Sequence, residues 1–202
     1  MAKIVDITQW KEASEILKEG GLVAFATDTI YGIACRYDNQ ASQEKLKHAK
    51  ARPEEKSLPL VVGNLAQCEE IAEITSREKK IIEKWLPGAI TLILKKKSCV
   101  PDWVTNGKDT LAVRMIDVTG INEMIQDVGV PLFLTSANLS GEPVCQDANE
   151  VNERLGNKIE VILDGKHRDG LASTILDCTQ DELVVLRQGP IQLEDILKSL
   201  EG

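Results

Sequence analysis

The segment Leu22-Val23-Ala24-Phe25-Ala26-Thr27-Asp28-Thr29-Ile30-Tyr31-Gly32 joins a continuous apolar run to a polar turn. The apolar run, residues 22–26, is typical of a strand that is covered on both faces. The polar residues that follow place two hydroxyls and a carboxylate at the end of that strand. These groups can bind a small polar ligand, or Asp28 can cap the amides of a local turn. The spacing alone favours neither interpretation.

Strand and helix patterns alternate along the rest of the chain. Further strands are predicted at residues 3–7, 32–36, 59–62, 90–94, 111–115, 131–134, 159–163, 174–176 and 183–186. Helices are predicted at residues 8–18, 42–50, 65–73, 77–85, 121–128 and 147–155, and from about residue 193, with Thr8 capping the first. This alternation predicts an α/β fold, in which one sheet is layered with helices. Because no repeat or linker interrupts it, we expect residues 1–202 to form a single domain.

Composition and charge are those of a globular protein with an acidic surface. Of the 202 residues, 43% are hydrophobic and only 3% aromatic, so the core must consist mostly of Ile, Leu, Val and Ala. The formal net charge of −8 opposes contact with a phosphate backbone, which predicts weak binding of nucleic acid. No stretch approaches the ~20 apolar residues of a membrane span.

The cysteines and the missing motifs narrow the possible chemistry. The five cysteines lie far apart without a CxxC pair, which excludes the usual zinc spacings. An odd count without an apolar N-terminal run predicts reduced thiols and a cytoplasmic location. The chain contains neither a phosphate loop nor a dinucleotide fingerprint, and His48 and His167 are isolated. An ATP site would therefore have to be built from scattered polar residues at strand ends.

A basic segment follows the helix predicted at residues 42–50. Lys50, Arg52 and Lys56 bring three cations within seven residues, a pattern that suits a polyphosphate. Lys50 and Arg52 are two apart, and Pro53 favours an extended residue before it, so we expect both side chains to point the same way. Glu54 and Glu55 lower the net positive charge of this segment. The alternative to a phosphate-binding segment is a charged loop that is exposed to solvent.

Other polar residues also lie at the ends of apolar strands. Residues 135–141 read Thr-Ser-Ala-Asn-Leu-Ser-Gly, whose hydroxyl and amide groups can bind phosphate oxygens or an adenosine. The alternative is a polar turn into the following helix. A dispersed set consists of Thr110, Arg114, Ser173 and Arg187. Arg114 ends an apolar strand and needs an anionic partner, which a ligand carboxylate can provide.

Seven short motifs, spread over nearly the whole chain, resemble those of the YrdC/Sua5 family. They are Thr27-Asp28-Thr29-Ile30-Tyr31-Gly32, Lys50-x-Arg52-Pro53, Pro87-Gly88-Ala89-Ile90-Thr91, Leu111-Ala112-Val113-Arg114, Ser136-Ala137-Asn138-Leu139-Ser140-Gly141, Ser173-Thr174 and Leu186-Arg187-x-Gly189. The Lys-x-Arg and Ser-x-Asn pair is that family's hallmark. The resemblance implies a twisted, open mixed sheet with flanking helices and a large positively charged cavity on one side.

The resemblance also implies a nucleotidyltransferase. Such an enzyme joins L-threonine, bicarbonate and ATP into threonylcarbamoyl-AMP, releases pyrophosphate, and so supplies the threonylcarbamoyladenosine modification of tRNA. Mg²⁺ would come with the nucleotide phosphates, without a metal bound by the protein. The product would pass to a downstream threonylcarbamoyl-transfer machinery, and the net charge predicts weak or indirect contact with tRNA.

The family's functional residues match positions of this chain. ATP would contact Lys50, Arg52, Lys56, Thr110, Asn138 and Arg187. L-Threonine would be held by Thr29, Arg114, Ser136 and Ser173. Catalytic roles would fall to Lys50, Arg52, Ser136 and Asn138.

Two departures from the family pattern keep alternatives open. Many members carry a histidine where this chain has Gly63, and the chain ends soon after Arg187, so we expect the extra C-terminal domain of the longer Sua5 branch to be missing. The alternatives are a paralogue similar to YciO with little synthase activity and an RNA-binding module of the same fold. A carbamoyl-transfer module of hydrogenase-maturation proteins is disfavoured, because this chain has neither their acylphosphatase nor their zinc segments.

Overall fold

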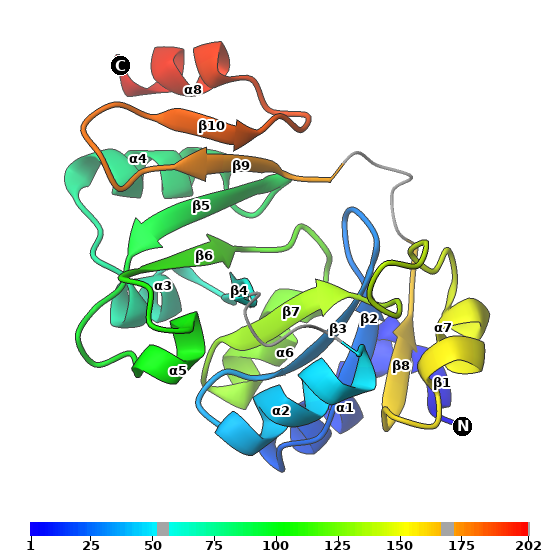
Figure 1. Cartoon of the computed structure of the whole chain (residues 1–202). Coiled ribbons are helices and arrows are strands. Elements are labelled where there is room, and N and C mark those ends of the chain that lie inside the picture. The colour runs from blue at the N-terminus through cyan, green and yellow to red at the C-terminus, as the bar shows by residue number, and fades with distance from the viewer. Residues whose placement is uncertain (52–56, 167–171, 202) are drawn as a thin grey trace.

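The computed structural model describes residues 1–51, 57–166 and 172–201, and within them ten strands form one open mixed sheet (Figure 1). In their order across the sheet, the strands are β1 (Lys3–Asp6), β8 (Val161–Asp164), β2 (Val23–Ala26), β3 (Tyr31–Arg36), β7 (Leu132–Ser136), β4 (Leu60–Val61), β6 (Thr110–Arg114), β5 (Ile90–Lys95), β9 (Thr174–Asp177) and β10 (Val184–Arg187). The sheet contains both parallel pairs such as β4–β6 and antiparallel pairs such as β3–β7. The predicted α/β fold is confirmed.

Helices flank this sheet in the described part of the chain. They are the 3₁₀ turn η1 (Ile7–Gln9) and the α-helices α1 (Trp10–Lys18), α2 (Gln40–Ala49), α3 (Leu65–Ile71), α4 (Ser76–Trp85), α5 (Asp102–Thr105), α6 (Ile121–Val128), α7 (Ala148–Leu155) and α8 (Leu193–Leu200). None of these helices combines the length and the apolar character that crossing a bilayer requires. The predicted cap Thr8 is wrong, because the Asp6 carboxylate accepts the Thr8 amide at 2.9 Å and begins the 3₁₀ turn.

The apolar run at residues 22–26 is buried on both faces of the sheet, as its sequence predicts. Val23 and Phe25 pack in a cluster with residues of α1 and α6. Ala24 and Ala26 belong to the larger cluster on the other side, which includes residues of α2 and α7. Alternate residues of β2 therefore anchor helices on opposite faces, and the turn after β2 is held firmly in place.

The short strand β4 lies between β7 and β6, and Gly63, two residues after it, lies close to α6. The Gly63 amide donates to Gln67 Oε1 at 2.8 Å, and Gln126 Nε2 donates to the Gly63 carbonyl at 3.1 Å. A Cβ at Gly63 would lie 2.7 Å from the Asn122 carbonyl oxygen. A histidine side chain therefore has no room at this position unless α6 moves.

We expect Gly63→Ala to lower the free energy of unfolding by about 1–3 kcal/mol, because the added carbon overlaps backbone atoms of α6. A glycine-to-alanine change in open space would instead stabilise slightly, through the unfolded chain. Urea unfolding of Gly63→Ala beside Ser98→Ala, at an exposed position, measures the difference. A Gly63→Ala protein as stable as the wild type would contradict this packing.

Candidate functional site

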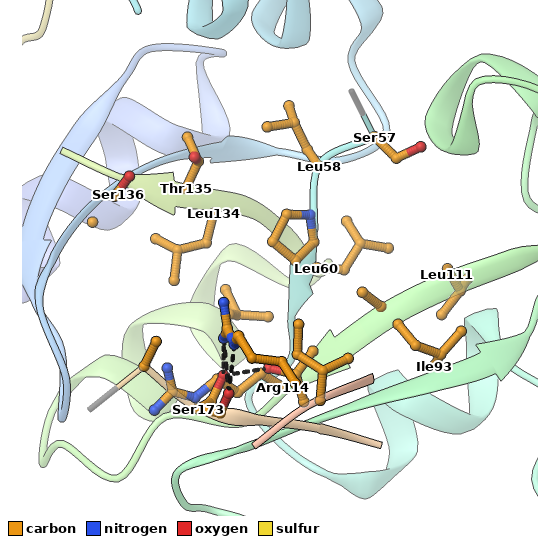
Figure 2. A pocket seen from close by; sticks show the side chains of 18 of the residues that line it. Ser57, Leu58, Leu60, Ile93, Leu111, Arg114, Leu134, Thr135, Ser136 and Ser173 are labelled. Atoms are coloured by element: carbon orange, nitrogen blue, oxygen red, sulfur yellow. Dashed lines mark hydrogen bonds between the residues drawn. The ribbon is translucent and has the colours of Figure 1, made fainter. Parts of the chain in front are cut away.

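A cavity of about 440 Å³ opens among the β2–β3 turn, β4, β6 and β9 (Figure 2). One part of its lining is apolar and consists of Ile30, Leu58, Pro59, Leu60, Val61, Ile93, Val104, Leu111, Ala112, Leu134, Ala172 and Ile175. Hydroxyl and cationic groups make up most of the rest. Figure 2 shows Thr135 and Ser136 on one side, across from Arg114 and Ser173. An apolar cavity with a few convergent polar groups is the usual form of a small-molecule site.

The turn between β2 and β3 is capped by Thr27, not by Asp28. Thr27 Oγ1 donates to the Ile30 carbonyl at 2.6 Å and accepts the amides of Thr29 and Ile30, each at 3.1 Å. The alternative in which Asp28 caps local amides is therefore wrong. The Asp28 carboxylate instead points toward β6.

Asp28 forms a buried ion pair with Arg114, whose Nη2 lies 2.6 Å from Asp28 Oδ1. The guanidinium also donates from Nη1 to Thr29 Oγ1 at 3.1 Å and from Nε to the Gly88 carbonyl at 3.2 Å. Burial lowers the pKa of Arg114, Asp28 opposes that shift, and the nearby Arg187 adds to it. The anionic partner that the sequence demands thus comes from the chain itself. Two of the five N–H groups of Arg114 keep no partner among the described residues.

Arg187 is held beside this pair by Ser173. Its Nε and Nη2 donate to the Ser173 carbonyl at 3.0 and 2.8 Å, and Nη2 also reaches Ser173 Oγ at 3.1 Å. The Ser173 hydroxyl lies 2.9 Å from Thr91 Oγ1. Two guanidinium groups are therefore fixed near each other at one end of the cavity, where an anion would relieve their repulsion.

Lys50 differs from its prediction. It ends α2 in a helical conformation, and Ala51 has a φ of 48°, so this part of the chain is not extended. The Lys50 ammonium is buried and donates to the carbonyls of Ser136 and Asn138, the latter at 2.7 Å. The expectation that Lys50 and Arg52 share one side of an extended segment fails at Lys50, while Arg52 and Lys56 lie outside the described residues.

The structure brings six of the predicted site residues to the cavity: Thr29, Thr110, Arg114, Ser136, Ser173 and Arg187. Among the described residues, its lining does not include Lys50 or Asn138, which lie behind Ser136. Lys108 also lines the cavity, although it belongs to none of the motifs named above. Its position two residues before Thr110, on the same side of an extended chain, is the signal that could have found it.

The described lining carries Lys108, Arg114 and Arg187 but no aspartate or glutamate. Asp28, which is not part of the lining, forms an ion pair with one of these cations, Arg114. Over residues 1–51, 57–166 and 172–201, no group of three His, Cys, Asp or Glu side chains is arranged to hold a metal ion. The arrangement can therefore attract anions and orient them with hydroxyl groups.

We expect Asp28→Ala to destabilise the protein by about 3–5 kcal/mol, because it leaves the buried Arg114 charge without its partner. Asp28→Leu combined with Arg114→Met should recover much of that loss, since neither charge remains buried. Glu12→Ala is the matched control, because the exposed Lys3–Glu12 pair should contribute less than about 1 kcal/mol. Equal losses for Asp28→Ala and Glu12→Ala in urea unfolding would refute the importance of the buried pair.

Comparison with known proteins shows which family this chain resembles. The Sua5/YciO/YrdC family model, described as "Telomere recombination", matches residues 15–189. A threonylcarbamoyl-AMP synthase of Pyrococcus abyssi is 36% identical over 196 residues, which cover 95% of this chain and 58% of the relative. The solved structure of P. abyssi Sua5 complexed with L-threonine has a TM-score of 0.90 and 34% identity, over 98% of this chain and 60% of that one.

A more distant structure shows the fold alone. E. coli YciO has a TM-score of 0.85 at 22% identity, over 97% of this chain and 100% of its own. The chain spans less than two thirds of the length of the P. abyssi proteins that it matches. From the family match over most of its residues, together with the shared fold and motifs, we conclude that this chain belongs to the Sua5/YciO/YrdC family.

Proposed function

We propose that this protein is a threonylcarbamoyl-AMP synthase, which condenses L-threonine, bicarbonate and ATP and releases pyrophosphate. The observation that carries the proposal is the cavity in which Arg114 and Arg187 lie near each other beside hydroxyl groups, without a carboxylate in the described lining. ATP, bicarbonate and the carboxylate group of threonine all need cations of this kind. The name of the P. abyssi relative and its structure with L-threonine support the same activity.

In this proposal L-threonine binds at the Arg114 end of the cavity. Its carboxylate takes the two N–H groups of Arg114 that have no partner among the described residues, and Thr29 and Ser173 supply hydroxyls beside it. Asp28 holds the guanidinium in one orientation, so Arg114 loses little conformational entropy when threonine binds.

ATP then takes the remaining length of the cavity. Arg187 and Thr110 contact the nucleotide, and Arg52 and Lys56 act as further phosphate ligands. Mg²⁺ enters as part of the nucleotide substrate, bound to its phosphates. The side-chain polar atoms of Lys50 and Asn138 donate hydrogen bonds to carbonyl oxygens of the loop at residues 136–142. Both residues therefore contribute by holding that loop in place.

The chemistry needs positioning more than a strong base. The threonine amine attacks CO₂ derived from bicarbonate, a C–N bond forms, and loss of the amine proton leaves a carbamate. A carbamate oxygen then attacks the α-phosphorus of ATP, and the bond to the β-phosphate breaks to release pyrophosphate. Holding the two reactants in line and stabilising the charge on the phosphates are the protein's contributions.

The proposal extends to the protein's surroundings. Residues 1–202 act as a single domain with a net cationic cavity in an otherwise acidic molecule. The product passes in the cytoplasm to the machinery that modifies tRNA, and the charge of −8 keeps direct contact with tRNA weak. Tight tRNA binding at physiological salt would instead favour the RNA-binding alternative.

We expect pyrophosphate release from ATP to require both L-threonine and bicarbonate, because each substrate supplies part of the carbamate that attacks ATP. A coupled pyrophosphate assay in CO₂-depleted buffer, with each substrate omitted in turn, measures this requirement. Release that continues at the same rate without threonine would contradict the synthase activity. Binding of threonine and ATP without any release would favour a paralogue similar to YciO.

Arg114→Lys should raise the KM for threonine roughly 10- to 150-fold, because a lysine keeps the charge but loses hydrogen bonds to the carboxylate. The KM for ATP should change less than about threefold, since the phosphates lie on other residues. Lys84→Ala, which removes an exposed cation of α4, is the control. A larger effect on ATP than on threonine would assign Arg114 to the nucleotide.

A further inference from the structure

A second hollow adjoins the cavity at the N-terminal end of β6. It has a volume of about 570 Å³ and is lined by the end of β5 and the start of β6. Thr110, the first residue of β6, lines both the cavity and this hollow. The two spaces therefore meet at Thr110. Figure 2 shows Ser57 and Leu111 on this side of the cavity, away from Ser136 and Ser173.

Two lysines flank Thr110 at this junction. Lys95 stands directly opposite Thr110 in the antiparallel β5–β6 pair, which places their Cβ atoms about 5 Å apart on one face of the sheet. Lys108 precedes Thr110 by two residues and lines the cavity. Both lysines are exposed, and neither ammonium forms a hydrogen bond or ion pair within the described part of the chain. The Thr110 hydroxyl has no partner there either, so two ammonium groups and a hydroxyl are available to a ligand.

The main chain that carries these lysines is held in place. The Lys108 amide donates to the Thr105 carbonyl at 3.3 Å, and Thr105 Oγ1 donates to the Lys108 carbonyl at 2.6 Å. The Lys96 amide donates to the Asp109 carbonyl at 2.9 Å, which ties the turn before β6 to the end of β5. The two ammonium groups therefore extend from fixed points, while their flexible side chains can adjust to an anion.

The acidic residues of the second hollow leave these two cations without a partner. Glu73 and Asp109 also line it, but neither forms an ion pair with Lys95 or Lys108 among the residues that the structure describes. Lys96 differs, because it forms an ion pair at 2.7 Å with an aspartate of α5. The hollow as a whole carries charges of both signs, and two unpaired cations lie where it joins the cavity.

The proposed reaction moves negative charge in one direction. A carbamate oxygen forms a bond to the α-phosphorus of ATP, and the bond from that phosphorus to the bridging oxygen of the β-phosphate breaks. The bonding pair moves to the bridging oxygen, which leaves as part of pyrophosphate. The attacking and leaving oxygens lie roughly in line, on opposite sides of the phosphorus. Negative charge therefore grows on the side of the phosphorus that faces away from threonine.

That direction leads from one end of β6 toward the other. The threonine carboxylate is assigned to Arg114, the last residue of β6, and Thr110 begins the strand about 13 Å away. Arg187 lies near Arg114, so Lys108 is the cation of the described lining that lies toward the opposite end. A group that leaves away from Arg114 therefore moves toward Thr110 and the two lysines.

We infer that Lys95, Lys108 and Thr110 form a binding subsite for the diphosphate group that leaves from the α-phosphorus. The inference rests on the proposed function. Ammonium groups bind phosphate oxygens as point charges, and a diphosphate has enough oxygens to reach both lysines. Because both lysines are exposed, water and salt weaken the attraction. The subsite can thus stabilise the leaving group and still release pyrophosphate to solvent.

The test measures binding of pyrophosphate, ATP and AMP, each with Mg²⁺, by titration calorimetry. Lys95→Ala and Lys108→Ala should each weaken pyrophosphate binding about 2- to 5-fold, and the double variant about 4- to 20-fold, the range expected for exposed charge pairs. Lys108→Arg should keep most of the affinity, because the charge remains. Binding of AMP, which lacks the diphosphate, and of L-threonine should change less than about twofold.

Lys84→Ala is the matched control for net charge. It removes an exposed cation of α4 that lines neither the cavity nor the second hollow, so pyrophosphate binding should stay near the wild-type value. Thermal unfolding of each variant shows that folded proteins are compared. Since the substituted lysines are all exposed, these changes should leave the melting temperature close to that of the wild type.

ATP and free pyrophosphate show when the subsite is filled. If the double variant weakens both, the β- and γ-phosphates occupy the subsite before the bond breaks. If it weakens pyrophosphate alone, the group reaches the subsite after the bond breaks. Either result supports a diphosphate subsite at these lysines.

Unchanged pyrophosphate binding in the double variant would overturn the inference. An equal loss of AMP binding, or an equal loss in Lys84→Ala, would overturn it as well, because the effect would then not depend on the diphosphate or on this place. An active wild type with such a result would contradict this inference alone. A wild type that binds pyrophosphate through these lysines but releases none from ATP, threonine and bicarbonate would contradict the proposed function alone.

Discussion

The buried pair of Asp28 and Arg114 is the interaction on which the rest of the site depends. It joins the turn after β2 to the end of β6, across the intervening strands of the sheet. A buried cation is costly unless it is paired and hydrogen-bonded, and Arg114 satisfies that need with Asp28, Thr29 and Gly88. The pair holds the guanidinium in one orientation, and two of its N–H groups keep no partner among the described residues. A positive charge with hydrogen-bond donors therefore faces the cavity.

The opposite wall of the cavity is organised in a different way. There the Lys50 ammonium donates to main-chain oxygens, and the Asn138 amide bonds to main-chain and side-chain groups. These hydrogen bonds hold the loop at residues 136–142 in place. One wall thus offers cations and the other offers oriented hydroxyls and an apolar surface. A ligand with an anionic group and an apolar part would meet complementary chemistry along this cavity.

The sequence predicted the alternation of elements, the buried strand at residues 22–26 and six residues that the structure brings to the cavity. Periodicity carries that information because burial repeats along a strand or helix. The short helix α5 and the cap at Asp6 were missed, since neither has an extended apolar pattern. The direction of Lys50 and the pairing of Asp28 could not be predicted either. Both depend on partners 86 to 88 residues away, which only the sheet topology brings close.

The most direct test of the account follows the carbon of bicarbonate. The protein would be incubated with ¹³C-bicarbonate, L-threonine and Mg-ATP and observed by ¹³C NMR. The account predicts a new carbamoyl carbon resonance, split by coupling to ³¹P through the oxygen that joins it to the α-phosphate. A spectrum in which the label stays in bicarbonate and CO₂, while calorimetry shows that threonine and ATP are bound, would contradict it.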